Sequence, residues 1–253
     1  MFDPQDPRYS RIRQFVGTDA LIRLHESRVL VVGLGAVGSY AVEGLARAGV
    51  GRLRLIDFDI IQPSNINRQL YALQSTVGIP KTTAALARVR DINPDCDVEA
   101  ERIFVHTDTL DEVFGDFSPD FVVDAIDALT PKVELMCEIR RRGLRGVSSM
   151  GAALRSDPTK IAIGRLRDVH GCPLARMVKK RFRSRGEPME AVCVYSSEDV
   201  SRVRIALLGE PEPRVSEGFE RGRLRNVLGS LPTLTGIFGL TIANHVIQKL
   251  IEE

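Results

Sequence analysis

A short apolar strand leads into a glycine-rich turn and a helix near the start of the chain, and this feature constrains the fold most. Residues 28–32 are a β-branched run, and Gly33, Gly35 and Gly38 follow in the spacing G-x-G-x-x-G. Residues 36–48 then have helical periodicity. Such glycines allow a tight turn and let a phosphate approach the helix N-terminus. The segment predicts the first strand–helix unit of a nucleotide-binding sheet.

The same alternation continues to residue 150. The remaining elements of this half are strands at 53–56, 98–104, 121–125 and 146–150, and helices at 81–92 and 131–142. The 121–125 run is continuously apolar, as is typical of a central parallel strand. Strands separated by helices predict an α/β fold with a Rossmann-like, doubly wound, mainly parallel sheet.

After residue 150 the pattern changes. The pattern predicts an antiparallel strand at 160–166, a basic helix at 173–183, a further strand at 191–195 and a loop at 197–225. The last apolar stretch, 233–250, predicts a helix buried in the core rather than a membrane span, because its uninterrupted apolar part is short. We expect one domain over 1–253, with a nucleotide-binding half at 1–150 and a substrate-facing half at 151–253.

Charge is distributed unevenly along the chain. Residues 1–139 hold 14 Lys and Arg against 21 Asp and Glu, whereas residues 140–225 hold 20 against 10. This asymmetry suggests a polyanionic partner for the second half, although a solvated basic face explains the charge equally well. The polar N-terminus does not resemble a signal peptide, and the four cysteines form no C-x-x-C pair. A reducing cytoplasm is therefore the expected compartment.

Polar side chains near the ends of the predicted strands suit a nucleoside triphosphate. Asp57 ends the second strand 19 residues after Gly38, where a carboxylate can bind ribose hydroxyls. Arg68 can pair bidentately with phosphate oxygens, and Lys81 can place a point charge on a phosphate. Asp127 follows the central strand and can hold Mg²⁺. This set favours triphosphate chemistry over an NAD-dependent oxidoreductase, which the glycine turn alone would also fit.

These motifs (G-x-G-x-x-G, D-F-D, S-N-x-N-R-Q, V-G-x-P-K and D-A-I-D) resemble the adenylating domain of the ubiquitin-activating superfamily, which includes ThiF, MoeB and HesA. The resemblance runs from about residue 8 to the C-terminus. It implies a ThiF-type adenylating fold that activates a carboxylate with ATP and Mg²⁺ and releases pyrophosphate. By resemblance, the nucleotide is held by Gly33, Gly35 and Gly38, the ribose by Asp57, the phosphates by Asn65, Arg68 and Lys81, and the Mg²⁺ by Asp127.

The resemblance also implies a homodimer, in which an N-terminal arginine reaches the partner's site. Arg11 is the best match for that arginine. Paired zinc cysteines of the MoeB type are missing, and stretches such as D-A-I-D-A-L-T-P-K, V-Y-S-S-E and G-S-L-P-T-L-T-G-I-F-G-L are similar to the branch of tRNA threonylcarbamoyladenosine dehydratases. That branch adenylates the carboxylate of threonylcarbamoyladenosine in tRNA and forms a cyclic product with overall loss of water.

A tRNA substrate would explain the basic second half. We expect the helix at 173–183 and the loop after it to follow the tRNA through phosphate contacts, which give affinity but little sequence selection. The candidate contacts are Arg176, Lys179, Lys180, Arg181 and Arg183. Cys172, beside His170, is a possible reactive thiol, although a free cysteine is more often a small core residue.

Alternatives stay open at this point. The chain could instead adenylate the C-terminus of a ubiquitin-like sulfur carrier, as ThiF and MoeB do, or act as a non-catalytic adapter. The basic half and the absent zinc cysteines favour the tRNA enzyme, and the intact set of Arg68, Lys81 and Asp127 argues against an adapter. The sequence does not decide which tRNAs are bound, whether a cysteine desulfurase is a partner or whether a monovalent cation is held structurally.

Overall fold

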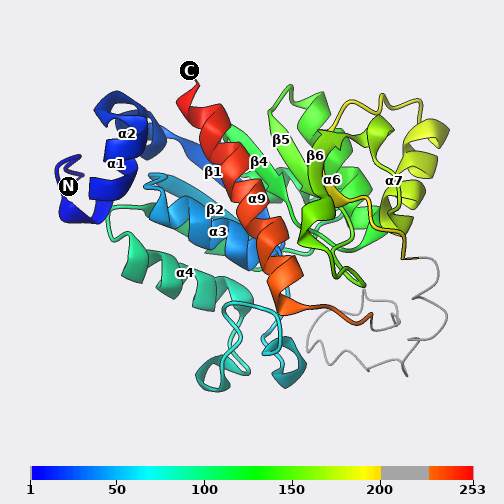
Figure 1. Ribbon diagram of the computed structural model, residues 1–253, viewed down its shortest axis with the longest axis horizontal. Helices are drawn as coiled ribbons and strands as arrows, with labels where there is room; N and C mark the ends of the chain where they lie inside the picture. The colour runs from blue at the N-terminus through cyan, green and yellow to red at the C-terminus, as the bar shows by residue number, and fades with distance from the viewer. Residues whose placement is uncertain (1, 201–227, 253) are drawn as a thin grey trace.

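One continuous sheet of seven strands crosses the molecule (Figure 1). The computed structural model describes residues 2–200 and 228–252. The strand order is β3-β2-β1-β4-β5-β7-β6, and all neighbours are parallel except β6 and β7. The strands are β1 Arg28–Val32, β2 Arg52–Ile56, β3 Asp97–Glu101, β4 Phe121–Asp124, β5 Gly146–Ser149, β6 Ile161–Arg165 and β7 Val192–Ser196.

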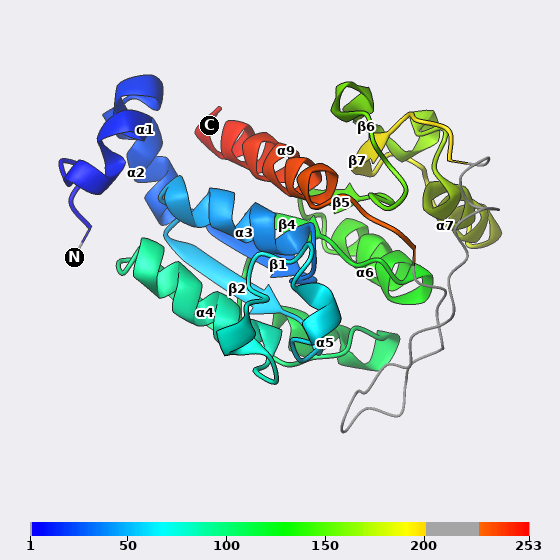
Figure 2. The same cartoon turned by 60° about the horizontal axis from the view of Figure 1, so that its bottom comes forward.

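Helices cover both faces of this sheet. They are α1 Ser10–Val16, α2 Thr18–Glu26, α3 Gly38–Arg47, α4 Lys81–Ile92, α5 Leu110–Phe114, α6 Leu129–Arg141, α7 Pro173–Ser184 and α9 Pro232–Ile251. On one face α3, α4 and α9 pack over the strands, whereas α5 and α6 pack on the other, and α7 packs beside α6 (Figure 2). The arrangement is the doubly wound sheet that the sequence predicts.

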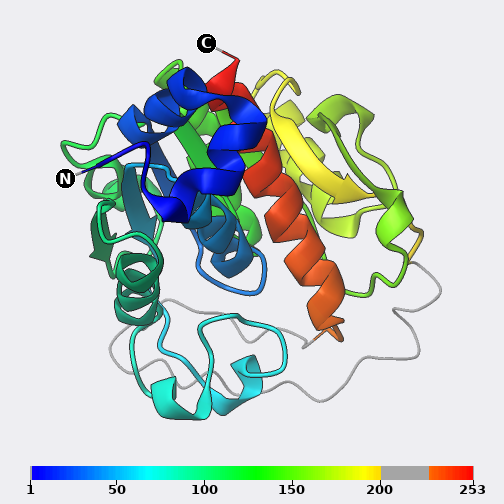
Figure 3. The ribbon, with the colours of Figure 1, turned by 60° about the vertical axis from the view of Figure 1, so that its left-hand side comes forward.

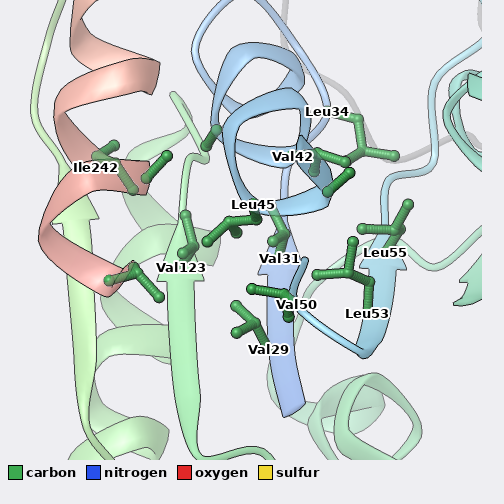
Figure 4. Packing of buried hydrophobic residues seen from close by; sticks show 14 of the residues in the cluster. Val29, Val31, Leu34, Val42, Leu45, Val50, Leu53, Leu55, Val123 and Ile242 are labelled. Carbon is green, nitrogen blue, oxygen red and sulfur yellow. The ribbon is translucent and has the colours of Figure 1, made fainter. Parts of the chain in front are cut away.

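Alternate residues along the central strands feed two separate cores. Val29 and Val31 of β1 point toward α3 and α9, together with Val123 of β4 (Figure 4). Leu30 and Val32 of β1 point to the opposite side, where α5 and α6 lie. All five side chains are buried, as the period-two geometry of a doubly covered strand requires. This explains why these strands read as continuous apolar runs.

The C-terminal helix α9 lies against α3 and is part of the core (Figure 3). Two glycines bring the helices together: a Cβ at Gly239 would stand 2.3 Å from the carbonyl oxygen of Val37, and one at Gly44 would stand 2.7 Å from the Cβ of Ala243. By length and composition α9 could also cross a membrane. Its apolar residues Leu234, Phe238, Ile242, Val246 and Leu250 are instead buried within the protein.

Several boundaries differ from those expected. The strand expected at 98–104 pairs only as far as Glu101, because Ile103 and Val105 turn into the core beside α5. Helix α3 starts at Gly38 rather than at residue 36, since the glycine turn occupies the residues before it. The strand expected at 191–195 joins the sheet parallel to β5, so that β6 is the antiparallel member. The sequence pattern did not predict α1, α2 or α5. Most of the loop expected at 197–225 lies outside the described residues.

The contact between α3 and α9 gives a test of the packing. Gly239→Ala should lower the free energy of unfolding by about 1–3 kcal/mol, because its methyl group overlaps the backbone of Val37 and Ala41. Thermal or denaturant unfolding measures this change. Asn244→Ala, at an exposed position of the same helix, is the control and should change stability by less than about 0.5 kcal/mol. Equal stability of the two variants would contradict the close packing.

Candidate functional site

The predicted nucleotide residues meet at the carboxyl ends of β1, β2 and β4, where ligands bind in open α/β sheets. The turn after β1 is closed by a hydrogen bond from the Gly33 N–H to the Ile56 carbonyl, at 2.8 Å. Helix α3 then begins at Gly38 without a side-chain cap. Its first N–H groups therefore lie at this edge, as a phosphate site requires.

Each of the three glycines of the turn is required for a different reason. Gly33 has φ +94°, and a Cβ there would stand 2.9 Å from the Ala125 carbonyl carbon. A Cβ at Gly38 would stand only 1.7 Å from the Gly33 oxygen, so both positions exclude a side chain. At Gly35 the nearest atom is 3.9 Å away, on the side chain of Gln69. Packing thus requires Gly33 and Gly38, whereas Gly35 leaves open space for a ligand.

Asp57 organises the residues around the glycine turn. One carboxylate oxygen accepts from the Leu34 N–H at 2.6 Å, and the other accepts from the Asp59 N–H at 2.8 Å. Lys81, at the start of α4, donates from Nζ to Asp59 Oδ2 at 2.8 Å and lies 4.0 Å from Asp57 Oδ2. A main-chain bond from the Lys81 N–H to the Asp59 oxygen fixes the helix start. The glycine turn, the end of β2 and the start of α4 therefore form one connected unit.

Burial and charge act against each other in this cluster. Lys81 and Asp57 are buried, with 5% and 8% of their surface exposed. Burial lowers the pKa of Lys81, but Asp57 and Asp59 more than offset this, and the net pKa is raised. Burial raises the pKa of Asp57 despite the opposing charge of Lys81. Lys81 therefore stays an ammonium ion near neutral pH, held between Asp57 and Asp59.

The segment after β2 folds back onto α3 and brings Asn65 and Arg68 to the same edge. The Leu70 N–H donates to Ser39 Oγ at 3.2 Å, and Asn65 Oδ1 accepts from the Gln62 N–H at 3.1 Å. Arg68 donates from Nη1 to the Ser64 oxygen and to Asn67 Oδ1. These acceptors are neutral, so a phosphate could draw the guanidinium away from them at modest cost.

Asp127 lies on the turn between β4 and α6. Its side chain is exposed and close enough to Lys81 to raise the pKa of that lysine. The Ala125 N–H donates to the Val32 oxygen, so this turn packs directly against the glycine turn. The structure thus brings together Gly33, Gly35, Gly38, Asp57 and Asp127, with Asn65, Arg68 and Lys81 beside them.

Arg11 does not lie near the candidate nucleotide site of its own chain. It is exposed on α1, which is anchored near the amino ends of the strands through the bonds of Tyr9 to Asn93 and Arg8 to Asp95. The N-terminal helices and the 60–80 segment therefore lie at opposite ends of the molecule (Figures 1 and 3). Arg11 could reach a nucleotide site only in a second copy of the chain.

The basic residues of α7 divide into two kinds. Arg176, Lys180, Arg181 and Arg183 are exposed, while Ala175, Val178 and Phe182 face the core. Lys179 is different, because its Nζ donates to the carbonyl oxygens of Arg167 at 2.8 Å and Val169 at 2.7 Å. Its ammonium group holds the 166–169 turn and is already engaged within the protein. The structure therefore separates Lys179 from the other candidate phosphate contacts.

Cys172 is buried as the N-cap of α7. Its sulfur accepts from the N–H groups of Ala175 and Gly151, both at 3.4 Å. His170 is exposed, and its Nδ1 lies 3.1 Å from the Asp168 oxygen. This geometry gives the sulfur a structural role, and a reactive role for Cys172 stays a prediction. The deeper Cys193 is unsuited to nucleophilic chemistry, since burial raises its pKa to about 12.

Three further residues at this edge of the sheet were not predicted from the sequence. Asp59 is the second aspartate of the D-F-D motif, and the motif alone predicts no separate role for it. Asp124 and Lys132 form a fully buried ion pair of 2.6 Å under the Asp127 turn. The sequence feature that could have predicted this pair is the first aspartate of D-A-I-D, which a lysine follows eight residues later. A lysine on a helix, however, is normally expected to have a solvated side chain.

Comparison of the chain with known proteins identifies its family. A model of the ThiF family matches residues 9–253. The chain belongs to the ThiF family. The tRNA threonylcarbamoyladenosine dehydratase of Bacillus subtilis strain 168 is 36% identical over 251 residues, which cover 97% of this chain and 95% of that relative. The SAMP-activating enzyme E1 of Haloferax volcanii is 43% identical over 122 residues, but these cover only 47% of this chain.

The ThiF-type fold is also seen in solved structures. The crystal structure of E. coli tRNA N6-threonylcarbamoyladenosine dehydratase, TcdA, in complex with ATP has a TM-score of 0.84 and 30% identity, and the match covers 99% of this chain and 96% of that chain. The same enzyme in complex with AMP has a TM-score of 0.85. The chain therefore has the ThiF-type fold, with a mainly parallel sheet and one antiparallel edge strand.

The glycine turn yields a paired test. Gly33→Ala should lower the free energy of unfolding by about 1–3 kcal/mol because of its positive φ and the contact with Ala125. Gly35→Ala should leave stability within about 0.5 kcal/mol. It should weaken ATP binding about tenfold, equivalent to about 1.4 kcal/mol, because its methyl group enters the open space. Thermal unfolding and calorimetric titration measure the two effects, and normal ATP binding by the Gly35 variant would contradict this placement.

Proposed function

We propose that the chain uses ATP to dehydrate N6-threonylcarbamoyladenosine in tRNA to a cyclic form. The observation that carries this proposal is the full-length similarity to enzymes named tRNA threonylcarbamoyladenosine dehydratase. The glycine turn, Asp57 and Lys81 supply a nucleotide site of the required type at the carboxyl edge of the sheet. In this proposal residues 1–150 hold the nucleotide and residues 151–253 face the tRNA, within one domain.

The proposed reaction has two steps, which are transfer of the adenylyl group to the substrate and ring closure with release of AMP. A carboxylate oxygen of the substrate attacks the α-phosphorus of ATP, and pyrophosphate leaves. The carbamoyl group of the same substituent then attacks the activated acyl carbon, a proton is released, and AMP leaves with the former carboxylate oxygen. The substrate loses one water overall. Holding the reacting groups on one substituent replaces a bimolecular step with an intramolecular one, and cations near the α-phosphate offset its developing charge.

Magnesium fits the residues present. Mg²⁺ in phosphate-transfer sites is commonly held by one or two carboxylates together with substrate phosphates. Asp127 is an exposed carboxylate at the sheet edge, with Asp59 close to the same lysine. In the described part of the chain, no group of three or more His, Cys, Asp or Glu side chains could hold a metal by itself. The site therefore suits a metal that arrives with ATP, and Mg²⁺ would neutralise phosphate charge there.

Formal charge in the nucleotide site supports a homodimer. Arg68 and Lys81 supply two positive charges, whereas Asp57, Asp59 and Asp127 supply three negative charges. A triphosphate would add further negative charge to a cluster that is already acidic. Mg²⁺ offsets part of it, and Arg11 of a second copy would offset more. An arginine carried on α1, at the far end of its own chain, would therefore be of use in the site of a second copy.

The outward face of α7 is the proposed tRNA surface. Helix α7 starts beside Gly151 at the carboxyl ends of the strands, because the Cys172 sulfur accepts from the Gly151 N–H there. It then runs away from that edge, so that Arg176 lies nearest to the site and Arg183 lies about 10 Å further along the helix. Arg176, Lys180, Arg181 and Arg183 present charge along this path. A soluble enzyme acting on tRNA would work in the cytoplasm without a membrane partner.

Activation of a sulfur carrier is the weaker candidate. The SAMP-activating enzyme E1 of Haloferax volcanii and the molybdopterin-synthase adenylyltransferase of Haemophilus influenzae match only 47% and 60% of this chain. Cys172, the cysteine singled out in the sequence, is buried as a helix cap rather than placed for thiol transfer. We therefore include no cysteine desulfurase in the proposed reaction, and the reaction as written uses no structural monovalent cation.

The proposed reaction is tested by AMP formation from ATP and Mg²⁺. AMP should form with tRNA that carries threonylcarbamoyladenosine, and mass spectrometry of the nucleosides should show loss of one water. Unmodified tRNA should yield no AMP above background. AMP formation with a Gly-Gly-tailed carrier protein but not with the modified tRNA would overturn the proposal.

Two neighbouring lysines test the tRNA surface. Lys180→Met should reduce the slope of log affinity against log salt by about 1 and leave thermal stability unchanged, because it removes one phosphate contact. Lys179→Met should keep the slope and lower the free energy of unfolding by about 1 kcal/mol, because the bonds to Arg167 and Val169 are lost. Filter binding of tRNA at several salt concentrations separates the two. An unchanged slope in an Arg176→Ala, Lys180→Ala and Arg183→Ala triple variant would exclude this face.

A further inference from the structure

A fully buried ion pair lies beneath the turn that carries Asp127. The side chains of Lys132 and Asp124 are both 0% exposed, and Lys132 Nζ lies 2.6 Å from Asp124 Oδ2. Ser148 Oγ donates to the same carboxylate oxygen at 2.6 Å and lies 3.0 Å from Nζ. The other oxygen, Oδ1, accepts from the Ile126 N–H at 3.0 Å. One carboxylate thus joins a helix, a neighbouring strand and a turn.

The three elements meet at the carboxyl edge of the sheet. Asp124 is the last residue of β4, and Ser148 is its register partner on β5. Lys132 lies in the first turn of α6 and donates its N–H to the Ala128 oxygen. Asp127 stands between these two anchored ends. The Asp124 carboxylate therefore holds the near end of the 125–128 turn directly and the far end through Lys132.

Stability alone does not account for this pair. Desolvating two charges costs several kcal/mol per ion, and apolar side chains of similar volume often serve as well or better. The thiol of Cys193, which is fully buried, lies close to both charges. The turn that the pair fixes also packs against Gly33, whose missing Cβ would stand 2.9 Å from the Ala125 carbonyl. The pair and the glycine turn therefore contact the same 125–128 turn, from different sides of Asp127 in the chain.

We propose that the buried Asp124–Lys132–Ser148 network is a positioning device for Asp127 and thereby sets the Mg²⁺ dependence of ATP binding. This inference rests on the proposed function, in which Asp127 faces the metal carried by ATP. All three side chains are buried beneath the turn. Outer groups of this kind orient metal-binding side chains, and their loss commonly weakens metal affinity by about 10- to 100-fold.

The test is ATP binding by the full-length chain at graded Mg²⁺, measured calorimetrically without tRNA. The double variant Asp124→Asn with Lys132→Met removes both buried charges, while the asparagine oxygen can still accept from Ile126. It should fold, and its half-saturating Mg²⁺ concentration should rise about tenfold or more. Excess Mg²⁺ should restore ATP affinity, which would not happen after general loosening of the fold. An unchanged Mg²⁺ dependence in the folded variant overturns the proposal.

Two further variants complete the experiment. Arg54→Met removes another buried cation, paired with Glu99 and Glu101 on β3, and should lower stability without changing the Mg²⁺ dependence. An equal Mg²⁺ shift in this control overturns the proposal. Ser148→Ala removes a single donor to Asp124 and serves as the test if the double variant does not fold. A smaller rise in the half-saturating Mg²⁺ concentration then supports the proposal, and no rise overturns it.

The outcomes also separate the two proposals. Wild-type protein that binds ATP with Mg²⁺ but makes no AMP with modified tRNA refutes the proposed function alone. A normal reaction together with an unchanged Mg²⁺ dependence in the folded double variant refutes the positioning role alone. Absence of Mg²⁺-dependent ATP binding in the wild type refutes both.

Discussion

The carbonyl oxygen of Gly33 packs so closely against the start of α3 that no side chain fits between them. This contact joins the end of β1 to the helix that follows, and it places the first N–H groups of α3 at the carboxyl edge of the sheet. The turn after β4 packs against the same glycine. The nucleotide site therefore forms where two parallel strands end side by side, and its other residues are arranged around this fixed point.

Charged groups at this edge serve two distinct purposes. Asp57, Asp59 and Lys81 are bound to one another and to the backbone, so they join the glycine turn to α4 while keeping a lysine charged in a buried place. Arg68 is held by neutral acceptors, and Asp127 is exposed at the edge of the sheet. An acidic local balance then makes Mg²⁺ and a second chain's Arg11 physically reasonable contributors to the proposed reaction.

The proposed tRNA enzyme also makes use of the second half of the sheet. Strands β7 and β6 extend the parallel core, and α7 packs beside α6 with its charged face outward. The cap of α7 by Cys172 ties the start of that helix to the end of β5. A basic surface that begins at the nucleotide edge suits a substrate in which the reacting group is one modified base and the rest is phosphate backbone.

The amino-acid sequence by itself determined the class of fold, the glycine turn and the polar positions near the strand ends, because these depend on local periodicity and on residue type at fixed spacing. The pattern did not predict α1, α2 or α5, which are helices of only 7, 9 and 5 residues. It did not determine the parallel pairing of β7, since strand pairing depends on contacts between distant segments. Only the tertiary structure showed that Lys179 is engaged by carbonyl groups, that Cys172 caps a helix and that Arg11 lies far from its own site. It alone revealed Lys132 as a buried partner of Asp124, because burial of a charge is decided by what packs around it and not by its neighbours in the chain.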